Sequence, residues 1–86
     1  MDTLVSMKVF RHVVEAGSFV AAAERMDISA AMASKHVMHL EQQLGARLLN
    51  RTTRRVAPTE AGREYYERLS QVLTELDEAG QAVGAA

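Results

Sequence analysis

The sequence predicts a mainly α-helical domain in which three helices and a short two-stranded hairpin precede one long helix. Ala, Leu, Val, Glu and Arg dominate the 86 residues, and this composition favours helices over strands. Apolar residues recur at helical spacing in separate segments, and Gly, Ser and the single Pro stand between these segments. Because a chain of this length buries only about 60% of its unfolded surface, it has room for a single core.

The first two helices are predicted over 3–16 and 19–26. Gly17 can end the first helix, and Ser18 can begin the second because its hydroxyl can accept a hydrogen bond from a free backbone N–H. The apolar stripe of the first helix consists of Leu4, Met7, Phe10, Val13 and Val14.

The third helix is predicted from Ser29, its cap, to Leu44, with Gly45 closing it. The residues expected to face the core are Ala33, Val37, Leu40 and Leu44. At 100° per residue, the opposite face carries Ala31, Ser34, Lys35, Met38 and Gln42. Such a face, short-chained and with one charge, suits close approach to the base edges of a DNA major groove better than it suits plain solvation.

The segment 19–38 has the organisation of a helix-turn-helix. Two short helices are joined by a break at Asp27 and Ile28, and the small Ala22 and Ala23 allow the helices to cross closely. This spacing by itself leaves two alternatives open, a DNA-binding element and a helical hairpin that only builds a core.

The segment 48–58 is predicted to form two very short strands around a basic tip, a wing. Four arginines and no acidic residue occur within nine positions. They are Arg47, Arg51, Arg54 and Arg55. A basic run is often only a solvated loop, but directly behind a helix-turn-helix it suits contact with phosphates or with a minor groove.

The charge of the chain is divided unevenly. The formal net charge is −1, but residues 1–58 hold eight basic and five acidic residues, whereas 59–86 hold two basic and six acidic residues. The absence of Cys excludes a disulfide framework, a thiolate zinc site and a cysteine nucleophile. No apolar run approaches the roughly 18 residues that span a bilayer, and we expect a cytoplasmic protein.

Catalytic and metal sites are not expected. His36 and His39 lie three residues apart, but no carboxylate or Cys completes a metal site, so both are expected to be surface histidines. Ser34 and Lys35 are neighbours, and neighbours on a helix point about 100° apart. With no glycine-rich phosphate loop, the chain is predicted to be no enzyme and to hold no cofactor.

A set of motifs covers nearly the whole chain. They are Phe19-x-x-Ala22-Ala23, Ser29, Ser34-Lys35, Leu40-Glu41, Leu44-Gly45, Leu48-Leu49-x-Arg51-Thr52 and Thr59-Glu60-Ala61-Gly62. In their combined spacing the chain resembles the N-terminal DNA-binding domain of bacterial LysR-type transcriptional regulators. The resemblance implies a winged helix-turn-helix that binds a promoter inverted repeat in double-stranded DNA as a homodimer, and a tetramer in the intact regulator. It also implies a small-molecule effector, bound by a C-terminal domain that these residues do not include.

The resemblance assigns DNA contacts to the third helix, in the major groove, and to the wing, at the minor groove. The expected contact residues are Ser18, Ser29, Ala30, Ala31, Met32, Ser34, Lys35, Met38, Arg51, Thr52, Thr53, Arg54 and Arg55. Where the family commonly has Gln and Pro after the capping serine, this chain has Ala30 and Ala31. Ser34 and Lys35 are therefore expected to be the main polar pair. Ala30, Ala31 and Met38 are expected to lie against thymine methyl groups.

Residues 59–86 are predicted to form a linker helix for dimerisation, after a winged helix-turn-helix over 1–58. Apolar residues in this helix recur with heptad spacing, at Tyr65, Leu69, Val72, Leu76, Ala79 and Val83. One helix cannot bury such a seam unaided, so it is expected to pack on the same helix of a second subunit. The alternative is that the stripe folds back on the first helix of its own domain.

Two other functions remain as alternatives. The helices could form a protein-interaction module that binds no DNA, with the wing merely solvated. Metal binding by His36 and His39 ranks third. Salt-dependent affinity for DNA separates the first alternative from DNA binding, since only a DNA-binding protein releases counterions from the duplex.

Overall fold

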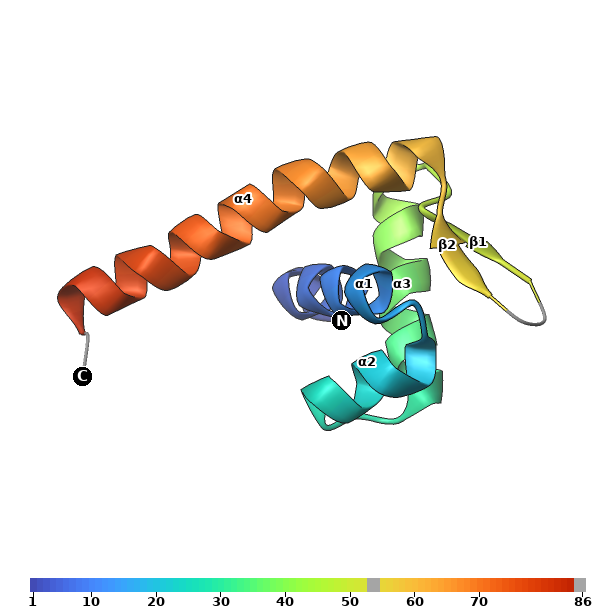
Figure 1. Ribbon diagram of the computed structural model, residues 1–86, viewed down its shortest axis with the longest axis horizontal. Helices are drawn as coiled ribbons and strands as arrows, with labels where there is room; N and C mark the ends of the chain where they lie inside the picture. The colour runs from blue at the N-terminus through green and yellow to red at the C-terminus, as the bar shows by residue number, and fades with distance from the viewer. Residues whose placement is uncertain (53–54, 85–86) are drawn as a thin grey trace.

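The computed structural model describes residues 1–52 and 55–84 of the chain (Figure 1). In chain order the elements are α1 (Thr3–Ala16), α2 (Phe19–Met26), α3 (Ala30–Leu44), β1 (Leu49–Arg51), β2 (Val56–Pro58) and α4 (Glu60–Val83). The prediction of three helices, a two-stranded wing and a long fourth helix is confirmed. Thr53 and Arg54, at the predicted wing tip, lie outside the described residues.

Side-chain caps begin all four helices. Asp2 Oδ1 accepts from the backbone N–H of Leu4 at 2.9 Å, and the hydroxyls of Ser18, Ser29 and Thr59 cap α2, α3 and α4 in the same way. The predicted caps Ser18 and Ser29 are thus confirmed, and each satisfies a backbone donor that the helix itself leaves free.

Left-handed residues end the first three helices. Gly17 and Gly45 have φ angles of 68° and 65°, as expected for residues that close a helix. The turn between α2 and α3 uses Asp27 instead, with φ of 57°. A short polar side chain tolerates this conformation better than a branched one, which explains why the predicted break falls here.

The core lies between α1, α2 and α3 and extends to the base of the wing. Its fully buried apolar residues include Val9 and Phe10 of α1, Val37 of α3 and Leu49 of β1. Leu4 and Leu44, predicted to face the core, are exposed. Both lie in the terminal turns of their helices, where the neighbouring elements no longer cover the predicted face.

The wing is an antiparallel hairpin that projects away from the helices (Figure 1). Its register pairs Leu49 with Pro58 and Arg51 with Val56. Beyond the strands, the backbone N–H of Thr52 donates to the carbonyl of Arg55 at 2.9 Å. The hairpin is thus rooted in the core at Leu49 and held at its outer end by a backbone hydrogen bond.

Helix α4 packs one face against the core as far as Leu73 and is exposed on all sides beyond it. Leu69 and Leu73 are buried in the core, and the ring of Tyr65 lies 5.8 Å from that of Phe10. Farther along, α4 extends beyond the other helices, and the molecule measures 43 × 25 × 22 Å (Figure 1). Within the described residues, no helix is both long and apolar enough to cross a membrane.

The α4 packing corrects part of the predicted dimer seam. Leu69 is only 5% exposed and Tyr65 is half-buried, because both pack against α1 of their own chain. The alternative of a stripe folded back on the first helix therefore holds for these two residues. The remaining seam residues are exposed, namely Val72, Leu76, Ala79 and Val83.

Candidate nucleic-acid interface

Helix α3 presents two different faces. Ala33, Val37 and Leu40 are buried, whereas Ala31, Lys35 and Gln42 are exposed, as predicted from the helical period. The exposed face also carries two large apolar side chains, Met32 (38% exposed) and Met38 (47% exposed). An outward face of small and apolar residues with one cation fits closely against a flat or grooved partner.

The turn before α3 fixes how this face is presented. The backbone N–H of Ile28 donates to the carbonyl of Ala23 at 3.0 Å, which closes the break between α2 and α3. Ser29 then caps α3, accepting from the N–H of Met32 at 3.1 Å. Ala30, half-buried, starts the helix, and Ser18 caps α2, where its hydroxyl accepts from Ala21 at 3.2 Å.

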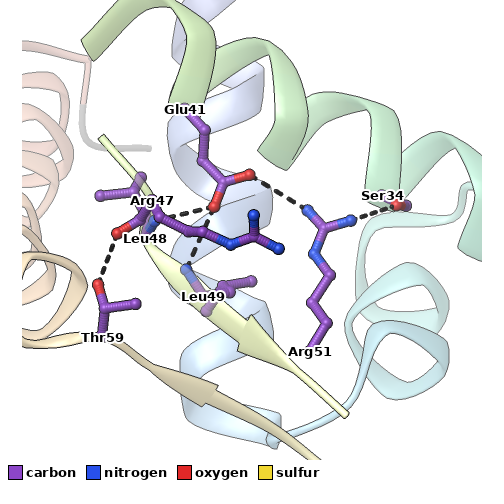
Figure 2. Close-up of polar contacts among 7 residues, drawn as sticks. All are labelled: Ser34, Glu41, Arg47, Leu48, Leu49, Arg51 and Thr59. Carbon is purple, nitrogen blue, oxygen red and sulfur yellow. Dashed lines mark hydrogen bonds and ion pairs between the residues drawn. The ribbon is translucent and has the colours of Figure 1, made fainter. Parts of the chain in front are cut away.

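Arg51 reaches from the wing to the helices (Figure 2). One guanidinium N–H donates to Ser34 Oγ at 3.1 Å, and another donates to Glu41 Oε1 at 3.4 Å. The guanidinium carbon also lies 5.0 Å from the centre of the Phe19 ring, a cation–π distance. Ser34 and Arg51, both predicted to contact DNA, are therefore hydrogen-bonded to each other.

Glu41 connects α3 to the start of the wing (Figure 2). Its Oε2 accepts hydrogen bonds from the backbone N–H groups of Leu48 and Leu49, at 2.8 Å and 3.3 Å. The sequence analysis did not predict this role, because it named Glu41 only as part of the Leu40-Glu41 motif. The available signal was one acidic residue on a helix that directly precedes a run of arginines.

Thr59 holds the other strand of the wing. Its hydroxyl lies 2.6 Å from the carbonyl oxygen of Arg47, to which it donates, and its N–H donates to the carbonyl of Leu48 at 3.0 Å (Figure 2). The side chain of Arg47 lines a hollow of about 320 Å³ together with Met38 and Gln42. This places a cation beside the exposed face of α3.

The described part of the wing tip is exposed and basic. The hydroxyl of Thr52 accepts from the N–H of Arg55 at 3.0 Å, and both residues are exposed. The predicted contacts Thr53 and Arg54 lie outside the described residues.

The prediction that His36 is a surface histidine is wrong. His36 is buried, and its Nδ1 lies 2.8 Å from Ser6 Oγ of α1. His39 is half-buried and lies 3.5 Å from the Thr3 hydroxyl. Across residues 1–52 and 55–84, no three His, Cys, Asp or Glu side chains are grouped as metal ligands.

The fold and these residues match a known family. The sequence profile described as "Bacterial regulatory helix-turn-helix protein, lysR family" matches residues 4–63. The chain belongs to the LysR family. The LysR-family domain is 49% identical over 83 residues to an uncharacterized HTH-type transcriptional regulator of Haemophilus influenzae, covering 96% of this chain and 29% of that protein. It is 42% identical over 85 residues to the HTH-type transcriptional activator AaeR of Escherichia coli, covering 99% of this chain and 28% of AaeR.

Solved structures show the same fold. The LysR-family domain superposes on the BenM DNA-binding domain in its complex with benA site 1 DNA with a TM-score of 0.89 and 29% identity, covering 99% of this chain and 94% of that chain. For the DNA-binding domain of CbnR in complex with DNA, the TM-score is 0.88 and the identity 32%, with 99% and 97% covered. The chain thus corresponds to the DNA-binding domain of a transcription regulator rather than to an enzyme, and spans less than a third of its curated relatives.

Proposed function

We propose that this domain binds double-stranded promoter DNA, with α3 in the major groove and the wing at the minor groove. The observation that carries the proposal is the outward face of α3, whose small and apolar residues are flanked by the cations Arg47 and Lys35. Side chains that are short or flexible allow a helix to approach base edges, and the cations neutralise phosphates.

The comparisons support DNA binding. The BenM and CbnR domains, which share this fold along nearly their whole length, were solved with DNA. In other helix-turn-helix proteins the second helix of the motif enters the major groove while the first crosses the backbone. Here the second helix is α3, and the cap hydroxyls of Ser18 and Ser29 lie at helix N-termini, which suit phosphate contacts.

We further propose that the domain acts as a homodimer through α4. The second half of α4 carries Val72 and Leu76, each 52% exposed, on a helix that leaves the rest of the domain. Pairing with a second α4 would cover these side chains and supply the two recognition helices that an inverted repeat requires. In this proposal 1–58 form the winged helix-turn-helix and 59–86 the linker helix.

The proposal extends to the longer protein implied by the relatives, each of which is more than three times as long as the matched segment. An intact regulator would work in the cytoplasm, as a dimer or tetramer, and would bind a small-molecule effector in its C-terminal domain.

Fluorescence anisotropy of a labelled duplex tests DNA binding. The 86-residue chain is titrated into duplexes with random cores and into an A/T-rich inverted repeat, over a series of salt concentrations. We expect the logarithm of the affinity to fall with the logarithm of the salt concentration with a slope of about −4 or steeper, since two α3 helices and two wings would neutralise several phosphates. Affinity that is absent at low salt would favour a protein-interaction module instead.

A further inference from the structure

We propose that Glu41 is a positioning residue for DNA recognition: its carboxylate, acting through Arg51 and two backbone amides, sets the position of the wing relative to α3. The inference rests on the proposed DNA-binding function. It assigns to Glu41 no contact with DNA.

The carboxylate holds the root of the wing. Leu48 and Leu49 are buried, and their N–H groups donate to Glu41 Oε2 at 2.8 Å and 3.3 Å. Two neighbouring amides converge on one oxygen, so the chain cannot slide along α3 without leaving buried donors unpaired. Glu41 therefore fixes the position of the start of β1 relative to α3.

Arg51 supplies a second point of attachment. Its guanidinium lies between Ser34 and Glu41, at 3.1 Å and 3.4 Å (Figure 2). These two residues are seven apart, about two helical turns, so they lie on the same side of α3 roughly 10 Å from each other. A planar guanidinium that bridges them fixes both the position and the orientation of β1 along the helix.

The same contacts change the roles expected of Ser34 and Arg51. With Ser34 Oγ and Glu41 Oε1 as acceptors and the Phe19 ring nearby, the guanidinium makes three contacts within the domain. Arg51 therefore connects the wing to α3. This connection positions the cations Arg47 and Arg55, which precede and follow Arg51 in the sequence.

The negative charge of Glu41 makes the direction of the change in DNA affinity a test of the proposal. Glu41 is the one acidic residue in the sequence of α3. If its carboxylate were a bystander beside the DNA, removing the negative charge would strengthen binding to every sequence, because DNA repels it. If the carboxylate positions the wing, removing it weakens binding to the preferred sequence in spite of the charge gained.

The experiment compares Glu41→Gln with the wild type on two duplexes, one selected from a random-core pool by the wild-type chain and one of unselected sequence. We expect affinity for the selected duplex to fall about tenfold, as for the loss of a charged hydrogen-bond group, while affinity for the unselected duplex stays equal or rises. Glu24→Gln, which removes an exposed acid from α2, is the matched control and leaves the ratio of the two affinities unchanged.

A double-mutant cycle tests the proposed path through Arg51. If Glu41 acts through the guanidinium, Arg51→Gln combined with Glu41→Gln weakens selective binding less than the sum of the single changes. Strict additivity would remove Arg51 from the proposal. If Glu41→Gln bound both duplexes more tightly than the wild type by the same factor, Glu41 would have no positioning role.

A readout without DNA separates this inference from the proposed function. Hydrogen exchange of the Leu48 and Leu49 amides, measured by NMR, is expected to be faster in Glu41→Ala, and exchange of the buried Val37 amide is expected to be unchanged. Faster exchange at all three would mean general unfolding and would count against a local positioning role. If the wild type binds no DNA while the two wing amides alone respond, the proposed function fails and Glu41 is only a structural clamp.

Discussion

Ser6 Oγ of α1 and His36 Nδ1 of α3 lie 2.8 Å apart in the core, where both side chains are buried. The Ser6 hydroxyl also donates to the carbonyl of Asp2 at 3.1 Å. With that donor occupied, the ring Nδ1–H of His36 is left to donate to Ser6 Oγ. This polar pair thus joins the first turns of α1 to the buried face of α3. The opposite face of α3 is the candidate DNA-binding face.

The first prediction concerns this pair. Ser6→Ala is expected to lower the free energy of unfolding by about 1–3 kcal/mol, since it leaves a buried ring nitrogen without a partner. The double change Ser6→Ala with His36→Leu is expected to be less destabilising than the sum of the single changes. Urea denaturation measures all three, with Lys8→Ala, an exposed change on the same helix, as the control. A double mutant that shows the full sum would mean that the pair is not coupled.

The second prediction compares two glycines of α4. A Cβ on Gly62 would collide with the backbone carbonyl of Leu48, whereas a Cβ on Gly80 would meet nothing within 4 Å. Gly62→Ala is therefore expected to destabilise the domain by about 1–3 kcal/mol, because α4 and the wing root must move apart. Gly80→Ala is expected to stabilise it by about 0.5–1 kcal/mol, through reduced freedom of the unfolded chain.

Urea denaturation of the two glycine variants decides between these opposite signs. Equal effects of Gly62→Ala and Gly80→Ala would contradict the close approach of α4 to the wing.

Local rules predicted those features that depend on neighbours in the sequence. The caps Ser18 and Ser29 and the closing residue Gly45 satisfy helix ends by themselves, so their pattern suffices. His36 and Glu41 depend on partners 30 and 7 residues away. A periodic pattern places such residues on a face but does not show what lies opposite them.

The same limit explains the predicted dimer seam. A heptad stripe on α4 looks the same whether its partner is a second chain or α1, and the structure uses α1 for its first half, where Leu69 packs into the core. The sequence determines the apolar period, whereas how much of that period is covered depends on where α4 extends beyond the other helices (Figure 1).

The third prediction concerns pH. Burial, together with a 2.9 Å hydrogen bond to Glu15, raises the pKa of the Tyr66 phenol above its usual value. Because the folded pKa exceeds the unfolded one, this contribution to stability is fully present below pH about 10 and is lost as pH rises through the folded pKa. Thermal unfolding between pH about 8 and 12, a range that brackets the usual tyrosine pKa of about 10, is expected to show a loss of stability that Tyr66→Phe reduces.

Spectrophotometric titration supplies the direct measurement. In a Tyr65→Phe background Tyr66 is the remaining tyrosine of the two in the chain. Glu15→Gln is expected to lower the pKa of Tyr66, because it removes the negative charge beside the phenolate. An unchanged titration would show that Glu15 does not act on Tyr66 in solution.

The fourth prediction separates the two halves of α4. Leu76→Glu places a charge on an exposed position of the proposed dimer face, so it is expected to yield folded monomers in sedimentation equilibrium. Leu69→Glu buries a carboxylate in the core and is expected to cost about 4 kcal/mol or more of stability. Dimers that persist in the Leu76→Glu variant would move the dimer interface away from α4.

The fifth prediction concerns the bases that α3 contacts. The Ser34 hydroxyl accepts a hydrogen bond from Arg51, which draws this oxygen toward the wing. The exposed side chains Met32 and Met38 cannot donate hydrogen bonds, so they are expected to bind thymine methyl groups through apolar contact. Replacing a contacted thymine by uracil in a selected duplex removes one methyl group, and we expect about fourfold weaker binding for each. Replacing it by 5-bromouracil, whose bromine is similar in size to a methyl group, is expected to preserve affinity.

Two protein variants assign this effect to one side chain. Met38→Ala is expected to weaken binding to the thymine duplex and to remove most of the difference between thymine and uracil at the position it contacts. Leu44→Ala changes another exposed apolar residue of α3, which lines a hollow with Tyr65 and Arg68 away from the candidate face, and is expected to keep the full difference. If replacing each thymine by uracil left the wild-type affinity unchanged, selectivity would instead come from DNA shape, recognised by the wing. Arg55→Ala would then carry the larger loss, because groove width is sensed by cations and not by methionine.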